Sequence, residues 1–198
     1  YFNGSGFKAT TTEQGLSSNS ISALHYSKWH KKLYYGNEYG LGVISKGTVS
    51  DIQITGTENT SVLSINPYKD SLLLIGTSGA GVIICDPQSN KKRLLTVYDG
   101  LPSGFIYFVA ADSTDYVWAG TEKGITRLKL DENFEILENL HYGFENGLRG
   151  VETNQNAFFL GNNEKYFGLI DGLYQYNELS SKKSGHTFDS HLTSVELL

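Results

Sequence analysis

Short apolar segments alternate with polar turns along the whole chain, and no segment shows the periodicity of a long amphipathic helix. Four of the apolar segments end in glycine, and each is followed by a polar turn with a further glycine and a second apolar segment. Because glycine adopts a positive φ without steric cost, this arrangement predicts four β-hairpins. The glycine-ended segments are residues 33–36, 73–76, 117–120 and 166–168.

Further strands are predicted before and after the hairpins. Upstream candidates are residues 20–24, 61–65, 106–110 and 156–159, and downstream candidates are residues 52–55, 94–98 and 136–140. The unit recurs after 40, 44 and 48 residues, measured from Gly36 to Gly76, Gly120 and Gly168. Four short strands in a period of this length are typical of a β-propeller blade.

The repeats predict an all-β chain of about four four-stranded blades, forming part of a larger, seven-bladed ring. We place the repeats at residues 15–56, 57–99, 100–146 and 147–184, with residues 1–14 ending a preceding blade. Residues 185–198 are expected to begin a β-sandwich or a linker. Because part of a ring has open strand edges, we expect the segment alone to associate or to be poorly soluble.

Composition and charge agree with this fold and exclude some partners. The chain has 13 Tyr, 10 Phe and 22 Gly, which suits strands and tight turns. The formal net charge is −5 and basic residues occur only in short clusters, so nucleic acid is not an expected partner. The single cysteine, Cys85, lies in an apolar segment and is expected to be buried.

The motifs resemble the two-component regulator propeller repeat. The resemblance rests on Gly15-Leu16-Ser17-Ser18-Asn19, on Gly100-Leu101-Pro102 with Val117-Trp118-Ala119-Gly120-Thr121, and on Gly147-Leu148 through Gly172-Leu173. It implies the extracytoplasmic (periplasmic) sensor region of a membrane histidine kinase, followed by a β-sandwich and a membrane helix. It further implies a small-molecule or oligosaccharide ligand, contacts with the remaining blades and the sandwich, and a possible homodimer.

Loops that lead into the innermost strands are the expected binding loops, since loops on a rigid scaffold often carry function. The most polar of them gives five candidate ligand or interface residues, which are Arg149, Glu152, Asn154, Gln155 and Asn156. The alternative is that they satisfy backbone groups of a connection between blades. Trp29, in a polar turn, is a further candidate for a partner or a sugar ring, whereas Trp118 is expected in the core.

The sequence lacks a convincing catalytic or metal-binding motif. Its five histidines do not have the spacing of a zinc site, and no nucleophile or phosphate-binding motif occurs. His141 with Glu145 and Glu152 is the best acid–base group. We therefore predict a non-catalytic, ligand-sensing segment without cofactor or metal. The alternatives are a general protein-interaction propeller, or a propeller lyase or glycosidase.

Overall fold

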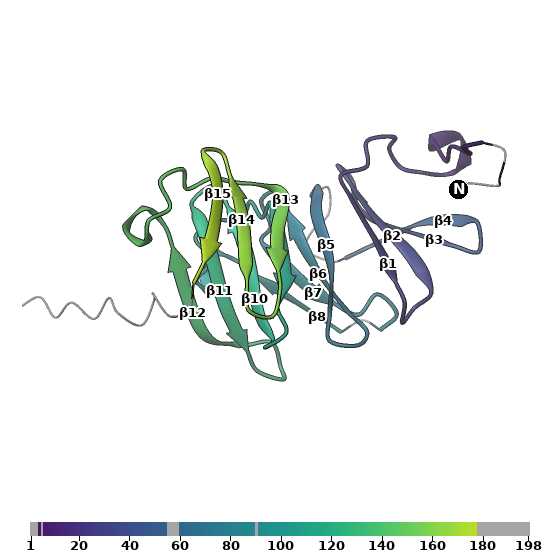
Figure 1. Cartoon of the computed structure of the whole chain (residues 1–198). Coiled ribbons are helices and arrows are strands. Elements are labelled where there is room, and N and C mark those ends of the chain that lie inside the picture. Colours follow the sequence, from purple (N-terminus) through teal and green to yellow (C-terminus); the bar gives the residue numbers. More distant parts are fainter. Residues whose placement is uncertain (1–3, 5, 55–59, 90, 178–198) are drawn as a thin grey trace, which may run out of the picture.

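The structure is a computed structural model that describes residues 4, 6–54, 60–89 and 91–177 of the chain. In this part, fifteen strands form four antiparallel sheets that follow one another in chain order (Figure 1). The all-β prediction is therefore confirmed. No helix among the described residues is long and apolar enough to cross a membrane.

We call the four sheets blades 1 to 4. Blade 1 contains β1 (Ala23–Ser27), β2 (Lys32–Asn37), β3 (Gly40–Ser45) and β4 (Thr48–Ile52). Blade 2 contains β5 (Val62–Tyr68), β6 (Leu72–Thr77), β7 (Val82–Cys85) and β8 (Lys92–Leu95). Blade 3 contains β9 (Phe108–Ala111), β10 (Tyr116–Thr121), β11 (Gly124–Leu130) and β12 (Ile136–Tyr142). Blade 4 contains β13 (Thr153–Leu160), β14 (Lys165–Leu169) and β15 (Gly172–Tyr176).

Within each blade, every strand pairs with the next strand in sequence. The first strands of the blades lie beside one another, β1 next to β5, β5 next to β9 and β9 next to β13. They are therefore the inner strands, and the later strands of each blade lie progressively further from the common axis (Figure 1). This order brings the beginning of every inner strand to the same end of the molecule.

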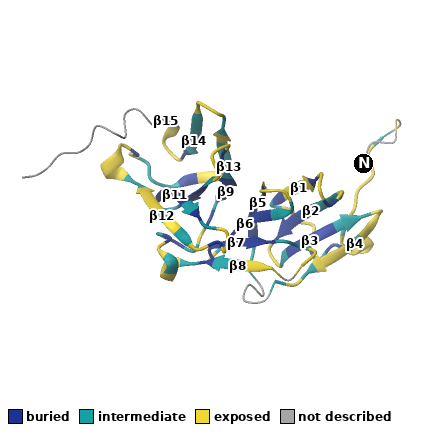
Figure 2. Cartoon of the chain, turned by 90° about the horizontal axis from the view of Figure 1, so that it is seen from below, coloured by how far each residue is buried: buried dark blue, intermediate teal, exposed yellow. Residues whose placement is uncertain are grey.

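Apolar side chains fill the spaces between successive blades. Tyr34 of blade 1 packs with Ile65 and Ile75 of blade 2, and all three are at most 4% exposed. Leu74 and Val109 belong to the core between blades 2 and 3. Burying one such side chain stabilises the fold by about 1.5–3 kcal/mol. Figure 2 shows the result, with β5–β7 largely buried and the outer strand β4 largely exposed.

Phe108, Trp118 and Phe167 join blades 3 and 4 in a stack of aromatic rings. The ring centroids of Trp118 and Phe167 are 5.3 Å apart, and those of Phe108 and Phe167 are 5.7 Å apart. Trp118 is 1% exposed, so its predicted place in the core is confirmed. Cys85 is also buried, as predicted.

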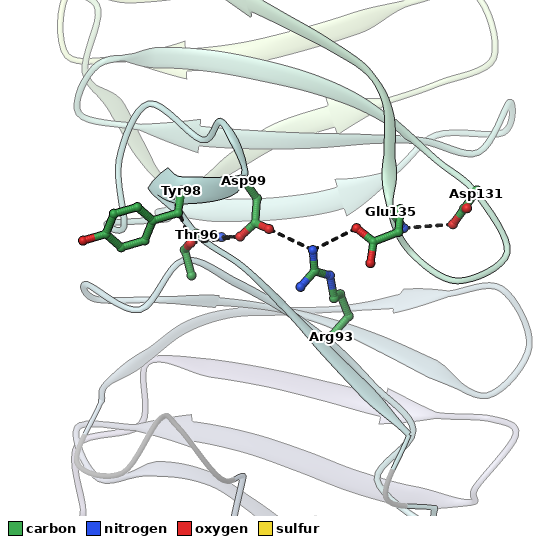
Figure 3. A network of polar contacts seen from close by, with 6 residues as sticks. All are labelled: Arg93, Thr96, Tyr98, Asp99, Asp131 and Glu135. Atoms are coloured by element: carbon green, nitrogen blue, oxygen red, sulfur yellow. Dashed lines mark hydrogen bonds and ion pairs between the residues drawn. The ribbon is translucent and has the colours of Figure 1, made fainter.

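Three short 3-10 turns repeat in the connections that lead to inner strands. They are η1 (Thr12–Gln14), η2 (Val97–Asp99) and η3 (Phe144–Asn146), and each is followed by a glycine with positive φ and a buried leucine. In η2, Asp99 accepts the backbone N–H of Thr96 at 2.8 Å. Figure 3 shows that Asp99 also binds Arg93 of β8, which in turn binds Glu135 of blade 3. The connection is thus fixed to both blades.

The glycine that ends the apolar segment of each repeat allows close approach of an inner strand. A Cβ atom at Gly36 would lie 2.5 Å from Val62 in the next blade, and one at Gly76 would lie 2.8 Å from the Ile106 carbonyl. The second glycine of each repeat has the expected positive φ, for example 128° at Gly40. The first glycine of the repeat therefore allows close packing between blades, and the second allows the positive φ of the turn.

Three predicted strands are misplaced. Residues 20–24 were predicted where β1 spans Ala23–Ser27, and residues 94–98 where β8 spans Lys92–Leu95. The sequence pattern put the last strand of blade 1 at residues 52–55, whereas β4 spans Thr48–Ile52. Lys46 and Gly47 both have positive φ, 50° and 82°, and they form a two-residue hairpin turn with Ser45 opposite Thr48. The chain therefore returns directly into β4.

Several expectations concern residues outside the described part. These are the rest of the last repeat, residues 178–184, and the predicted start of a sandwich or linker at residues 185–198. The same holds for residues 1–3, 5, 55–59 and 90. The size of the complete ring stays a prediction.

Candidate functional site

Three backbone carbonyl groups at or just before the beginning of the inner strands lie around the common axis. The carbonyls belong to Ser22, Leu63 and Tyr107. In its own blade, each of these residues comes directly before the residue that pairs with the glycine of the second strand. They are thus structurally equivalent in blades 1, 2 and 3. Leu63 lies at a register shift between Val62 and Ser64 in the pairing of β5 with β6.

Blade 4 supplies donors to all three carbonyls. The Gln155 side-chain amide donates to the Leu63 carbonyl at 2.9 Å and to the Ser22 carbonyl at 3.3 Å. The Asn156 side chain donates to the same Leu63 carbonyl at 3.1 Å, and its backbone N–H donates to the Tyr107 carbonyl at 3.2 Å. Two neighbouring residues therefore connect the inner regions of all four blades. We call these five residues the axial cluster.

An irregularity in β13 directs both side chains toward the axis. The sequence pattern placed Asn154 and Gln155 in a loop and Asn156 where that loop meets the predicted strand 156–159. All three belong to β13, whose pairing with β14 shifts register between Thr153 and Phe158. Asn156 has φ 53°, a left-handed conformation that asparagine tolerates better than most residues. A bulge of this kind re-aims side chains without ending the strand.

The other loop candidates have local partners. Glu152 accepts the Tyr107 hydroxyl at 3.1 Å, and Asn154 donates to the Leu169 carbonyl at 3.1 Å. Burial, followed by the hydrogen bond to Glu152, raises the pKa of Tyr107. The Arg149 backbone N–H donates to the Tyr174 hydroxyl at 3.2 Å, and its side chain is exposed. These residues border the axial cluster at the end where β13 begins.

Trp29 lies apart from the other candidates. It belongs to the turn between β1 and β2, which follows the end of an inner strand, whereas Arg149 and Glu152 precede the beginning of one. The indole is 63% exposed, as expected for a side chain in a polar turn. The structure therefore does not bring Trp29 together with the residues around β13.

The loops into the inner strands of blades 1 and 3 share a contact that the described residues of the blade 4 loop do not make. Ser18 donates to Glu38 at 2.6 Å, and Ser103 donates to Glu122 at 2.6 Å, each joining the loop to the turn between the second and third strands. In the last loop, Gly150 occupies the position of the serine, and a Cβ there would lie 2.3 Å from Asp171. The polar loop singled out from the sequence is thus also structurally distinct.

A second feature, which the sequence did not predict, is an inter-blade pocket of about 590 Å³ between blades 3 and 4. Aromatic rings form much of its lining, and Arg127 and several polar side chains complete it. The aromatic lining residues are Trp118, Tyr142, Phe167, Tyr174 and Tyr176, and the polar ones include Glu145, Asn146, Gln175 and Asn177.

Arg127 is held among the rings of the inter-blade pocket. Its guanidinium carbon lies 4.4 Å from the ring centroid of Tyr116, and its Nη1 donates to the Tyr176 hydroxyl at 3.0 Å. Nη2 lies 3.4 Å from a Glu138 carboxylate oxygen. The sequence signal that could have indicated this pocket is an arginine in the middle of a largely buried strand, β11. Aromatic faces and fixed polar groups together suit a small polar ligand with apolar surfaces.

The three residues of the acid–base group suggested by the sequence contact different partners. His141 contacts the Thr126 hydroxyl at 3.3 Å, Glu152 binds Tyr107, and Glu145 lines the inter-blade pocket. Among the described residues, no group of three or more His, Cys, Asp and Glu is placed to hold a metal ion. The structure therefore does not bring the three residues of the predicted acid–base group together.

The fold is similar to that of solved extracellular sensor domains. The extracellular domain of the hybrid two-component system BT3049 from B. thetaiotaomicron superposes with a TM-score of 0.69 and 18% identity over 86% of this chain. That of BT4673 from the same organism gives 0.67 and 18% over 82%. This chain spans only 25% and 23% of their lengths. The β-propeller prediction is confirmed, and the fold agrees with the resemblance found in the sequence.

The computationally designed Ika4 protein has a similar fold as well, with a TM-score of 0.60 and 20% identity. The match covers 82% of this chain and 93% of the designed one. No protein-family model matches the sequence, and a search of the curated proteins found no match.

Proposed function

We propose that this chain is a signal-input segment in the extracytoplasmic, periplasmic part of a two-component sensor histidine kinase. The observation that carries the proposal is the fold similarity to the extracellular domains of BT3049 and BT4673. The repeat motifs in the sequence support the same assignment independently. Since the chain spans about a quarter of those domains, the remaining blades, a following sandwich and the kinase belong to the parent protein in this proposal.

In this proposal the segment binds a small molecule or an oligosaccharide and does not itself catalyse a reaction. The inter-blade pocket supports a ligand of this class, because aromatic rings stack on the apolar faces of sugars while Arg127, Asn146 and Gln175 offer hydrogen bonds. Arg149 and Trp29 are further ligand or interface candidates, since both side chains are exposed. A ligand transmits a signal only if it binds one arrangement of the blades more tightly than another.

The test uses the full parent protein in membrane vesicles and measures autophosphorylation with a panel of oligosaccharides. We expect one saccharide to change the phosphorylation rate, and we expect Tyr142→Ala to weaken this response at least tenfold. Tyr98→Ala is the matched control, because Tyr98 is 99% exposed and lies outside the inter-blade pocket. Equal responses in both variants would remove the pocket from the proposal. A parent protein without a membrane helix and kinase domain would refute the sensor assignment itself.

A further inference from the structure

The turn between β1 and β2, which starts at Lys28, presents an exposed indole among exposed lysines. Trp29 is 63% exposed, and Lys28 and Lys31 are exposed as well. His30, in the same turn, has a side chain that is only 1% exposed, and its backbone N–H donates to the Ser27 hydroxyl at 3.1 Å. The buried histidine thus fixes the turn and leaves the indole and both lysines outside.

This turn meets the turn between β7 and β8 of blade 2. His30 Nε2 lies 3.7 Å from a carboxylate oxygen of Asp86, the first residue of the second turn. The second turn ends at Lys91, whose ammonium lies 4.8 Å from the ring centroid of Phe134. The fold therefore gathers two basic clusters that are far apart in the sequence. The cationic patch, as we call it, consists of Trp29 and five lysines, Lys28, Lys31, Lys32, Lys91 and Lys92.

Few carboxylates offset the charge of the cationic patch. The two turns contain one carboxylate, Asp86, so five lysines leave a formal charge of +4, although the whole chain carries −5. Asp86 is 20% exposed and accepts the Gln88 backbone N–H at 2.9 Å. The patch lysines other than Lys92 form no ion pair with any residue that the structure describes. The patch therefore attracts anionic groups from outside.

The cationic patch lies on an interface whose two blades are both described. The first hairpin turn of a blade packs on the blade that follows it, since Lys69 in blade 2 has its ammonium 5.9 Å from the ring centroid of Phe134 in blade 3. The turn of blade 1 packs on Asp86 of blade 2 in the same way. A blade before blade 1 would by this rule contact the second hairpin turn of blade 1, at Lys46, and would leave Trp29 exposed.

The charges at this end of the molecule decide which anionic partner fits. A plane of anionic lipid would also meet the hairpin turns of blade 3, where the exposed Asp115 and Glu132 would repel it. A short chain can instead follow the cationic patch alone. The Trp29 indole offers an apolar face on which a sugar ring can stack, and the lysines attract carboxylate or sulfate groups as point charges.

We propose that the cationic patch binds an acidic oligosaccharide, with a sugar ring on Trp29 and carboxylate or sulfate groups beside the lysines of both turns. The ligand bridges blades 1 and 2 and is separate from any ligand of the inter-blade pocket between blades 3 and 4. The proposal rests on the proposed function only in taking a saccharide as the ligand, and it assigns a chemical class to the partner of Trp29.

Titration of the 198-residue chain with hexagalacturonate and with a heparin hexasaccharide, followed by tryptophan fluorescence, tests the proposal. The chain has two tryptophans, and Trp118 is 1% exposed, so stacking on the exposed indole changes mainly the emission of Trp29. We expect a saturable change with at least one acidic hexasaccharide and none with neutral maltohexaose. Raising the salt concentration should weaken the binding.

Variants locate the binding at the patch. The double change Lys28→Ala and Lys31→Ala should weaken it about tenfold or more, because two charge-assisted contacts are lost. Calorimetry of Trp29→Ala should show binding about tenfold weaker. The matched control is Lys8→Ala with Lys123→Ala, which removes two exposed lysines outside the patch and should bind like the wild type. Circular dichroism melting shows that each variant is folded.

Other outcomes separate this proposal from the proposed function. Tyr142→Ala alters the inter-blade pocket and should leave binding of the acidic hexasaccharide unchanged, so failure of the pocket and failure of the patch are distinguished. Equal binding of neutral and acidic hexasaccharides, or unchanged affinity in both patch variants, would overturn the proposal. Binding to phosphatidylglycerol vesicles without binding of either acidic hexasaccharide would identify a membrane contact and overturn it as well.

Discussion

The Trp118 indole N–H donates to the Asp112 carboxylate at 2.9 Å, and both side chains are buried in blade 3. The same carboxylate accepts the Thr114 hydroxyl at 2.6 Å, within the turn between β9 and β10. Lys165 of blade 4 lies 3.6 Å away from it. Asp112 thus connects a hairpin turn, the central aromatic residue of its blade and the neighbouring blade.

Replacing Asp112 by alanine should lower the free energy of unfolding by about 3 kcal/mol or more, because it leaves a largely buried lysine and an indole N–H without their partner. Urea unfolding followed by tryptophan fluorescence measures the loss. Asp131→Ala is a matched control, because Asp131 accepts two turn N–H groups, of Asn133 and Glu135, at 2.8 Å in exposed positions. Losses of equal size in the two variants would show that Asp112 stabilises the fold through its turn hydrogen bonds alone, and not through Trp118 or Lys165.

Asp112 should also make stability depend on pH in the acid range. Burial opposes ionisation of this carboxyl, but hydrogen bonds from Thr114 and Trp118 prevail and hold its pKa below the ordinary 3.8. A depressed folded-state pKa gives stability that is present above pH 3.8 and is lost as the pH falls through the folded value. Asp112→Asn should therefore flatten the fall of unfolding free energy between pH 4 and pH 2, by up to about 1.4 kcal/mol per pH unit. An unchanged slope would show that Asp112 is not the group whose titration lowers the stability.

Gly42 should not tolerate a side chain. A Cβ at this position would lie 2.0 Å from Cζ of Tyr35, whose ring is 1% exposed and whose hydroxyl donates to Asp51 at 3.2 Å. We expect Gly42→Ala to cost about 1–3 kcal/mol of stability through overpacking. Gly6→Ala serves as the control, because nothing lies within 4 Å of its Cβ position. In the Tyr35→Ala background the cost at Gly42 should shrink, and strictly additive losses would show that the ring is not the cause.

The sequence revealed most of the fold because each blade repeats a local pattern. Glycines in register and alternating apolar residues depend only on neighbours in the chain, and they predicted the hairpins within a few residues. The last strand of blade 1 was misplaced because left-handed φ at Lys46 is not readable from the residue type. The axial cluster and the inter-blade pocket depend on contacts between blades far apart in sequence, such as Gln155 with Ser22. Periodicity carries no information about such contacts.

Gln155 and Asn156 should stabilise the arrangement of the inner strands. We expect Gln155→Ala to cost about 1 kcal/mol, the usual net value of a hydrogen bond, and Asn156→Gly to cost a similar amount. Glycine keeps the left-handed φ of 53°, so Asn156→Ala should cost more than Asn156→Gly. Urea unfolding measures each change, with Gln175→Ala on exposed β15 as the control. Variants as stable as the wild type would favour a recognition role for these side chains.

Protonation of His30 in mild acid should weaken the contact between blades 1 and 2. Its side chain is 1% exposed, with Nδ1 3.0 Å from the Tyr34 hydroxyl and Nε2 3.7 Å from Asp86. Burial lowers the pKa of His30 below 6.5 and outweighs the opposing effect of Asp86, while Lys32 lowers it further. The stability due to neutral His30 is therefore complete above pH 6.5 and is lost as the pH falls toward the folded value.

The melting temperature measured between pH 7.5 and pH 5 should accordingly fall less in His30→Gln than in the wild type. The difference corresponds to at most about 1.4 kcal/mol per pH unit for one proton. His25 has a pKa lowered by burial and by His30, so part of the slope should remain in the variant. Tyr34→Phe removes the hydrogen bond but keeps the imidazole buried, and it should retain the full pH dependence. A slope that is lost in Tyr34→Phe and kept in His30→Gln would show that His30 is not the titrating group.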